Sequence, residues 1–276
     1  MKKLLITVLV LVTCGCQTNS KQDSDNINTV TSSEESQNPL FYTPEQIQKL
    51  QFSEQAGYFI WIKDSLAWTA TDKIREEIDL SQIENPQGWL VHLDPEGNHR
   101  VSFYRSTRNE EILSFADVFY NDSFEISGFE ANPKRTVTEE EKTMLKALSS
   151  AGNSITEACS ENLNSVVLED DAGWNVFFLT PPTEPGVIPI GGAQRILVSR
   201  DGKTVLEQEP YSKSCMHLQP QGEDVHALMM THIVDEIPSP VHVFTSLSYD
   251  YPLYVATSLG LWKVVDGDIE EVKDKK

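Results

Sequence analysis

The sequence is poor in basic residues. Lys and Arg number 22 and Asp and Glu number 42, which gives a formal net charge of −20 over 276 residues. Nucleic-acid binding requires Lys and Arg to neutralise phosphates, and anionic lipid headgroups would repel an acidic surface in the same way. The composition therefore argues against both partners and favours cationic ones.

Motifs that would identify an enzyme are also absent. The sequence has no Gly-x-Ser-x-Gly elbow, no His-Glu-x-x-His helix and no Cys-x-x-Cys pair, the spacings typical of common hydrolases, metalloproteases and redox proteins. Phosphate-loop and dinucleotide-binding patterns are missing as well. From motifs we therefore predict no catalytic residue, no metal and no cofactor.

Cysteine is also scarce, and its positions are informative. Two of the four cysteines, Cys14 and Cys16, end a segment in which Lys2 and Lys3 precede an apolar run from Leu4 to Val12. That run is well short of the roughly 20 residues of a membrane-spanning helix. A basic head, a short apolar run and a small-residue exit are typical of a secretory signal that is removed.

The segment resembles the signal peptides of bacterial prolipoproteins, in which the cysteine after the cleavage site is lipidated. The resemblance implies that Cys16, which follows Gly15, carries the lipid. Cys14 is the alternative, because Leu11 stands three residues before it. Gln17 follows the favoured anchor where inner-membrane lipoproteins have Asp, which implies export to the periplasmic face of the outer membrane.

A polar stretch follows the anchor. Its sizeable apolar residues are Ile27 and Val30, too few to offset the entropy lost on ordering, so we predict a disordered tether. One globular domain is expected after it, and two lobes are the alternative. The predicted ranges are 1–15 for the signal, 16–39 for the anchor and tether, and 40–276 for the domain, or about 40–155 and 156–276 for the lobes.

Local patterns predict several helices. Thr43-Pro44-Glu45-Gln46 is typical of a helix start, with Thr as N-cap and Pro in the first turn, and the apolar spacing over 65–78 predicts a second helix. The run 58–62 fits either a strand or a continuation of the first helix. A capping box at Thr138 predicts a further helix that ends near Gly152.

Extended runs separated by turn residues predict strands elsewhere. The expected fold class is α+β: a mostly antiparallel sheet built from hairpins and a C-terminal meander, with two or three helices in the N-terminal half. The predicted hairpins cover 89–104, 114–129, 165–179 and 194–208, and the predicted meander strands are 225–234, 241–247, 253–257 and 261–265.

Cys159 and Cys215 remain once the signal and anchor are assigned. An exported protein meets an oxidising compartment, so we predict a disulfide between them that joins the two halves of the domain. Two buried thiols that act as small apolar groups are the alternative.

Histidines gather after the second of these cysteines. Four of the six lie between residues 217 and 242, and imidazoles with a thiolate would suit zinc or copper. If 225–234 is a strand, two of them share a face. Their spacing matches no metal motif, so structural roles are the main expectation. The candidate ligand residues are His217, His226, His232 and His242.

Asp64 and Asp72 flank Trp68, and carboxylates beside an aromatic side chain would suit an acid/base pair. Helix capping and surface exposure explain both residues without catalysis. Around them, Ala67-Trp68-x-Ala70-Thr71-Asp72 loosely, and the C-terminal third more closely, resemble a group of bacterial envelope proteins of unknown function, which implies no activity. The C-terminal residues that carry the likeness are Gly191-Gly192-x-x-Arg195, Ser199-x-Asp201-Gly202, Ser212-Lys213-Ser214-Cys215, His232 and His242-Val243-Phe244-x-x-Leu247.

These features predict a lipid-anchored cell-envelope protein that acts as a binding or scaffolding module rather than as an enzyme. Two alternatives stay open. One is an envelope hydrolase whose site gathers His226, His232 and Asp72 in the fold. The other is an acidic inhibitor of a cationic envelope enzyme such as a lysozyme. The implied partners are the membrane, through the anchor, and a cationic envelope protein.

Overall fold

The computed structural model of the chain describes residues 42–220 and 225–273. The predicted signal, both candidate anchor cysteines and the tether lie outside the described residues. Within them the fold is α+β, as predicted, with mostly antiparallel sheets.

Helix α1 (Pro44–Glu77) is a single 34-residue helix. Its start is as predicted: the Thr43 hydroxyl accepts from the Gln46 amide at 3.2 Å, and the Gln46 side chain accepts from the Thr43 amide at 2.8 Å. The separate helix predicted at 65–78 is wrong, because the run 58–62 continues the first helix. Such a run is ambiguous on apolar periodicity alone.

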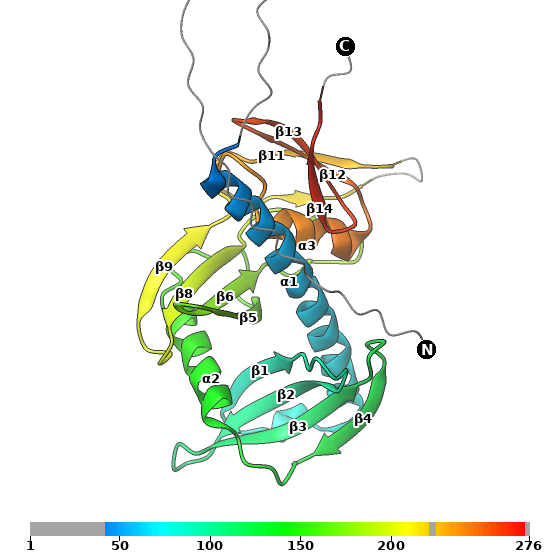
Figure 1. Cartoon of the computed structure of the whole chain (residues 1–276). Helices are drawn as coiled ribbons and strands as arrows, with labels where there is room; N and C mark the ends of the chain where they lie inside the picture. Colours follow the sequence, from blue (N-terminus) through cyan, green and yellow to red (C-terminus); the bar gives the residue numbers. More distant parts are fainter. Residues whose placement is uncertain (1–41, 221–224, 274–276) are drawn as a thin grey trace, which may run out of the picture. The chain divides into compact units, whose positions relative to one another are not determined.

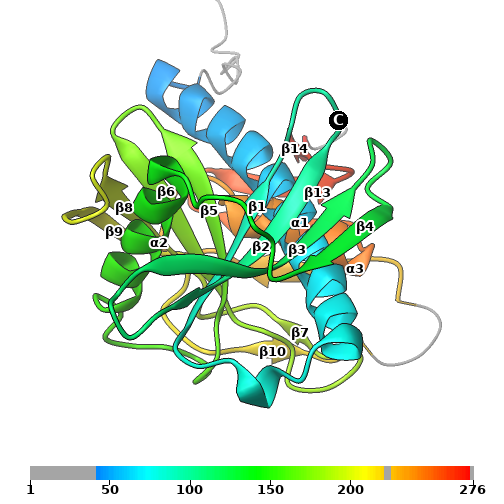
Figure 2. The same cartoon turned by 90° about the horizontal axis from the view of Figure 1, so that it is seen from below.

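Helix α1 runs past three sheets in turn (Figures 1 and 2), and its apolar contacts change along its length. Leu50 packs with the C-terminal sheet, Ile60 with the central sheet, and Leu66 with the N-terminal sheet. A helix that buries different faces in turn has no single apolar stripe. That is why the sequence pattern suggested a break inside it.

The N-terminal sheet has four antiparallel strands in the order β1-β2-β3-β4, which confirms the first two predicted hairpins. A short 3-10 helix, η1 (Leu80–Gln82), connects α1 to it. The strands are β1 (Pro86–His92), β2 (His99–Ser106), β3 (Ile112–Tyr120) and β4 (Ile126–Ala131).

The central sheet has the order β5-β6-β8-β9 and is antiparallel throughout, which confirms the next two hairpins. Strand β7, in the proline-rich segment 181–192 that connects β6 to β8, forms a separate two-stranded pair with β10. The strands are β5 (Asn164–Asp170), β6 (Gly173–Leu179), β7 (Ile188–Pro189), β8 (Gln194–Ser199), β9 (Val205–Pro210) and β10 (His217–Leu218).

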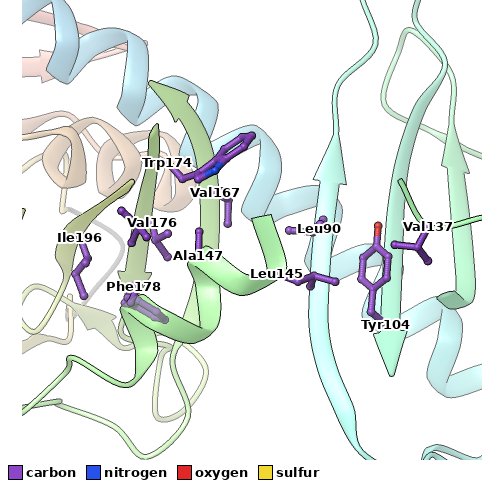
Figure 3. Close-up of a cluster of buried hydrophobic side chains, with 12 residues drawn as sticks. Leu90, Tyr104, Val137, Leu145, Ala147, Val167, Trp174, Val176, Phe178 and Ile196 are labelled. Atoms are coloured by element: carbon purple, nitrogen blue, oxygen red, sulfur yellow. The ribbon is translucent and has the colours of Figure 1, made fainter. Parts of the chain in front are cut away.

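Helix α2 (Glu139–Gly152) packs between these two sheets. Its predicted capping box is confirmed, with the Glu141 amide donating to the Thr138 hydroxyl at 3.1 Å. Figure 3 shows Leu145 of α2 facing Leu90 and Tyr104 of the N-terminal sheet, while Ala147 faces the central sheet. The helix therefore gives both sheets one continuous apolar core.

The C-terminal sheet has the order β11-β12-β13-β14, and β11 runs parallel to β12. The predicted strand at 241–247 is wrong: these residues belong to α3 (Pro240–Tyr249). Ser239 at the N-cap and Pro240 in the first turn start a helix there, and parallel strands need such a crossover. Strands β12, β13 and β14 form an antiparallel meander, which includes the predicted strands 253–257 and 261–265. The strand predicted at 225–234 is the shorter β11, which joins this meander through the α3 crossover. The strands are β11 (Leu228–Thr231), β12 (Leu253–Thr257), β13 (Gly260–Val265) and β14 (Asp268–Glu271).

The predicted disulfide is present: Cys159 and Cys215 are bonded, with Cα atoms 5.4 Å apart. It ties the segment after α2 to the segment before β10. Gly192 lies directly against it with a φ of +87°, and a Cβ atom there would overlap the Cys159 sulfur. Only glycine fits both that backbone conformation and that space.

Replacing Gly57 with alanine is expected to destabilise the protein although alanine is the better helix former. The new Cβ would lie 2.5 Å from both Pro240 O and Val243 Cβ of α3. Overpacking of this kind typically costs about 1–3 kcal/mol, against a propensity gain of about 1 kcal/mol. Urea unfolding should show a lower midpoint for Gly57→Ala than for Gln55→Ala at an exposed position of the same helix. Equal midpoints would mean that α1 and α3 are not held this close.

Candidate functional site

The structure brings together two of the four histidines of the candidate cluster and leaves the other two at the surface. His217 is exposed on β10 and His226 is exposed before β11. His232 and His242 are buried and their ring centroids lie 4.6 Å apart. Strand β11 ends at Thr231, so the expected shared strand face of His226 and His232 does not exist. The described part of the chain contains no group of three or more His, Cys, Asp or Glu that could hold a metal ion, and Cys215 is in the disulfide.

The buried histidine pair is built around the start of α3. His242 Nδ1 accepts from the Ser239 amide at 2.8 Å, so the imidazole takes the place that Glu or Gln has in a capping box. Burial, and then the neighbouring His232, lower the pKa of His242 to about 3. His232 Nε2 is buried without a hydrogen-bond partner among the described residues, and burial lowers the pKa of His232 as well. Both rings are therefore neutral structural groups at pH 7.

Replacing His242 with glutamine is expected to reduce the loss of stability at acid pH. An unfolded imidazole has a pKa of about 6.5, while burial holds the folded value at about 3. Because the unfolded state then binds the proton more readily, the folded state loses stability as the pH falls from about 6.5 toward 3. Glutamine keeps an acceptor for the Ser239 amide and does not titrate. Urea unfolding at pH 7 and pH 4.5 measures the difference.

The control for this prediction is His217→Gln on the exposed strand β10. It should lose as much stability between the two pH values as the unmodified protein. If His242→Gln loses the same amount too, His242 is not buried in its neutral form.

A half-buried histidine, His92, lies beside a carboxylate. His92 Nε2 is 3.5 Å from Glu141 Oε1, next to a cavity of about 170 Å³. Glu141 already accepts hydrogen bonds from Arg100, Arg135, the Tyr104 hydroxyl and the Thr138 amide. Burial, and then the charge of Arg100, lower the pKa of His92 to about 4. These hydrogen bonds to the Glu141 carboxylate attach α2 to the N-terminal sheet. The His92–Glu141 pair therefore has a structural role.

Two hollows of about 570 Å³ and 650 Å³ are larger than the site that we favour. The first surrounds the disulfide. The second lies between the first half of α1 and β9, and four of its charged residues pair within the protein: Lys49 with Asp235 at 3.1 Å, and Arg195 with Glu209 at 2.8 Å. Neither combines exposed aromatic side chains with an unneutralised charge.

A pocket of about 390 Å³ does combine them. It is formed by α1, by α3, by the start of β5, and by the end of β6 with the two prolines that follow. Because Trp61, Asp64, Ser65 and Trp68 are spaced i, i+3, i+4 and i+7, they share one face of α1. The lining residues are Trp61, Asp64, Ser65, Trp68, Thr69, Asn164, Leu179, Thr180, Pro181, Pro182, Phe244, Ser248 and Tyr249.

The pocket is open to solvent at its aromatic wall. Trp68 is 55% exposed. It is the only tryptophan among the exposed large apolar side chains of the described residues. Tyr58 and Phe59, more than two turns earlier in α1, are also exposed, and the Tyr58 ring lies 5.7 Å from that of Trp61. Exposed clusters of large apolar side chains mark interaction sites more often than scattered ones do.

Asp64 is the charged group of this pocket. Its Oδ1 accepts a hydrogen bond from Asn164 at 3.1 Å. Burial raises the pKa of Asp64 to about 6, against the effect of that bond. Neighbouring Lys63 provides no countercharge, because its ammonium donates to Val91 O and Val167 O. Within the described residues no cation lies within ion-pair distance of Asp64.

The structure does not bring Asp64 and Asp72 together as an acid/base pair, in agreement with the structural explanation of both residues. Eight residues along a helix separate Asp64 from Asp72 by about 12 Å, and Asp72 lies at the surface with Arg75 at 3.4 Å. Sequence reasoning selected Asp64 and Trp68 but missed Asn164 and Tyr249. The spacing of Trp61, Asp64 and Trp68 would have indicated the wall of the pocket if α1 had been predicted as one helix.

Comparisons of the chain with protein-family models, with curated proteins and with solved structures find no match. None of the described helices has the length and apolar character needed to span a membrane.

Proposed function

We propose that the protein is a lipid-anchored binding module of the bacterial cell envelope, and that the pocket between α1, α3 and the end of β6 is its ligand site. The observation that carries the proposal is the meeting of exposed Trp68 with the unneutralised carboxylate of Asp64 in one pocket. Ligand pockets are typically apolar hollows of about 300–1,000 Å³ with a few convergent polar groups. This pocket has that size and composition.

The hydrolase alternative has less support. Among the described residues, His226 and His232 make no hydrogen bond to a carboxylate or to a nucleophilic side chain. The inhibitor alternative is supported by the net charge of −20, which would attract a cationic enzyme. A lysozyme assay at low and moderate salt tests it, and undiminished lysozyme activity at both would remove it.

Anchoring is tested by metabolic labelling with a palmitate analogue. Label should be lost in Cys16→Ser and retained in Cys14→Ser, because Gly15 before Cys16 resembles the preferred cleavage site. The reverse pattern would move the anchor to Cys14. Retention of label in both single variants and in the double variant would overturn lipidation.

Ligand binding is tested with a panel of small cationic, neutral and sugar compounds, with thermal shift as the readout. Compounds that raise the melting temperature of the unmodified protein should do so less in Trp68→Ala, since the aromatic wall is shortened. Met229→Ala, which removes an exposed apolar side chain on β11 outside the lining, is the matched control. If hits stabilise Trp68→Ala as much as the unmodified protein, this pocket is not the binding site.

A further inference from the structure

We propose that the ligand is an organic cation, with an ammonium or trimethylammonium group held against Asp64 and its alkyl surface on Trp61 and Trp68. This inference rests on the proposed function of the pocket. It adds the chemical class of the ligand.

The charge of the lining supports a cation. Asp64 is the only charged residue among those that line the pocket. Asn164 occupies its Oδ1, and Oδ2 has no hydrogen-bond donor among the described residues. A ligand that supplies a positive charge would complete the coordination of this carboxylate, whereas an anionic ligand would be repelled by it. The net charge of −20 also raises the local concentration of cations.

The aromatic walls support the same class. Tryptophan faces attract ammonium groups through the ring quadrupole, and cages of aromatic side chains with a carboxylate are a common way to bind quaternary ammonium. Trp61 and Trp68 come from one face of α1, and Phe244 and Tyr249 come from α3. A rounded cation would therefore meet aromatic surface from two elements.

The polar groups of the lining argue against a sugar. A polyhydroxylated ligand needs several free donors and acceptors, but three of the polar side chains here are already bonded within the protein. Thr69 Oγ1 lies 2.8 Å from the Tyr120 hydroxyl, Thr180 donates to Gly191 O at 2.9 Å, and Asn164 donates to Asp64. Asp64 carries the only charge of the lining, and no cation of the described residues pairs with it.

Equilibrium titration of the full-length, detergent-solubilised protein tests the inference, with tryptophan fluorescence as the readout. The probes are choline, its uncharged analogue 3,3-dimethylbutan-1-ol, and maltose. Choline should bind at least tenfold more tightly than the uncharged analogue. Asp64→Asn should weaken choline binding at least tenfold, while Asp72→Asn, at an exposed carboxylate of the same helix, should leave it unchanged.

The pH dependence gives a second readout that does not need the Asp64 variant. Choline does not titrate between pH 5 and pH 7. The titratable groups at the site are Asp64, with its pKa raised by burial to about 6, and Tyr249 on α3, whose pKa burial raises to about 12. Choline affinity should therefore rise from pH 5 to pH 7 as Asp64 ionises, and the rise should be absent in Asp64→Asn.

The outcomes separate this inference from the proposed function. If the uncharged analogue or maltose binds as tightly as choline, and Trp68→Ala abolishes that binding, the ligand is not selected for its positive charge. The proposal that this pocket is the ligand site would then still hold. If choline binds equally well to Asp64→Asn and to the unmodified protein, the proposal of an organic cation held by Asp64 is also overturned. If no probe shows binding that depends on Trp68, both proposals are overturned.

Discussion

Replacing Arg135 with methionine is expected to lower the free energy of unfolding at pH 7 by about 3–5 kcal/mol, the usual cost of removing one partner from a buried ion pair. Arg135 lies between β4 and α2, and its guanidinium binds Asp117 Oδ2 at 2.6 Å and Glu141 Oε2 at 2.9 Å. The Asp117 and Glu141 side chains are 0% and 2% exposed. Methionine would leave Asp117 buried without its cation.

The pKa values of the two carboxyl groups show how much depends on this guanidinium. Burial alone would raise the pKa of Asp117, but hydrogen bonds from Arg135, Ser102 and Ser114 hold it below its usual value. Burial would also raise the pKa of Glu141, but hydrogen bonds from the Thr138 amide and from Arg135 lower it below its usual value. Since both folded pKa values are depressed, the network stabilises the protein above about pH 4 and loses that effect as the pH falls through the folded values.

The measurement is urea unfolding of Arg135→Met at pH 7 and pH 4.5, beside Arg108→Met at an exposed position between β2 and β3. Arg108→Met should stay close to the unmodified protein. The deficit of Arg135→Met should shrink at pH 4.5, because protonation neutralises the orphaned carboxylates. A deficit below about 1 kcal/mol, the range of a surface ion pair, would show that the network is not buried as described.

Features that depend on neighbours a few residues apart were predictable from the sequence. The capping boxes at Thr43 and Thr138 need contacts three residues apart. The β8–β9 turn is also closed by near neighbours: the Gly202 amide donates to Ser199 O at 2.8 Å, and Gly202 has a φ of +73°. In such segments the local preference and the final fold agree, so the pattern is a sufficient guide.

Features that depend on distant contacts were not predictable in the same way. An apolar run such as 241–247 fits a buried strand or a buried helix equally, and the contact with Gly57 that accompanies the helix comes from almost 190 residues earlier in the chain. The residues of the candidate site also fall into a predictable and an unpredictable group. Asp64 and Trp68 could be selected from the sequence, but Asn164 and Tyr249 reach the pocket only because β5 and α3 pack on α1. Arg135 gave no signal at all, since a loop arginine is ordinarily exposed.

The disulfide was predictable because it follows from counting cysteines, and its removal is the second large effect that we expect. Cys159→Ser/Cys215→Ser should lower the free energy of unfolding by about 4 kcal/mol on the chain-entropy model for the observed separation of 56 residues. The unfolded chain gains freedom when the link is lost, so the dependence of the unfolding free energy on urea should also steepen.

Loss of the disulfide should disturb the structure most in the segments that contact it. Gly192 lies against Cys159, and its amide donates to the Ser212 hydroxyl at 2.8 Å, so the loop after β7 and the segment before Cys215 are held to the same point. Dithiothreitol should lower the melting temperature of the unmodified protein to that of the double variant and leave the double variant unchanged. An unmodified protein that is insensitive to dithiothreitol, or that yields two free thiols at these positions when denatured without reductant, would contradict the disulfide.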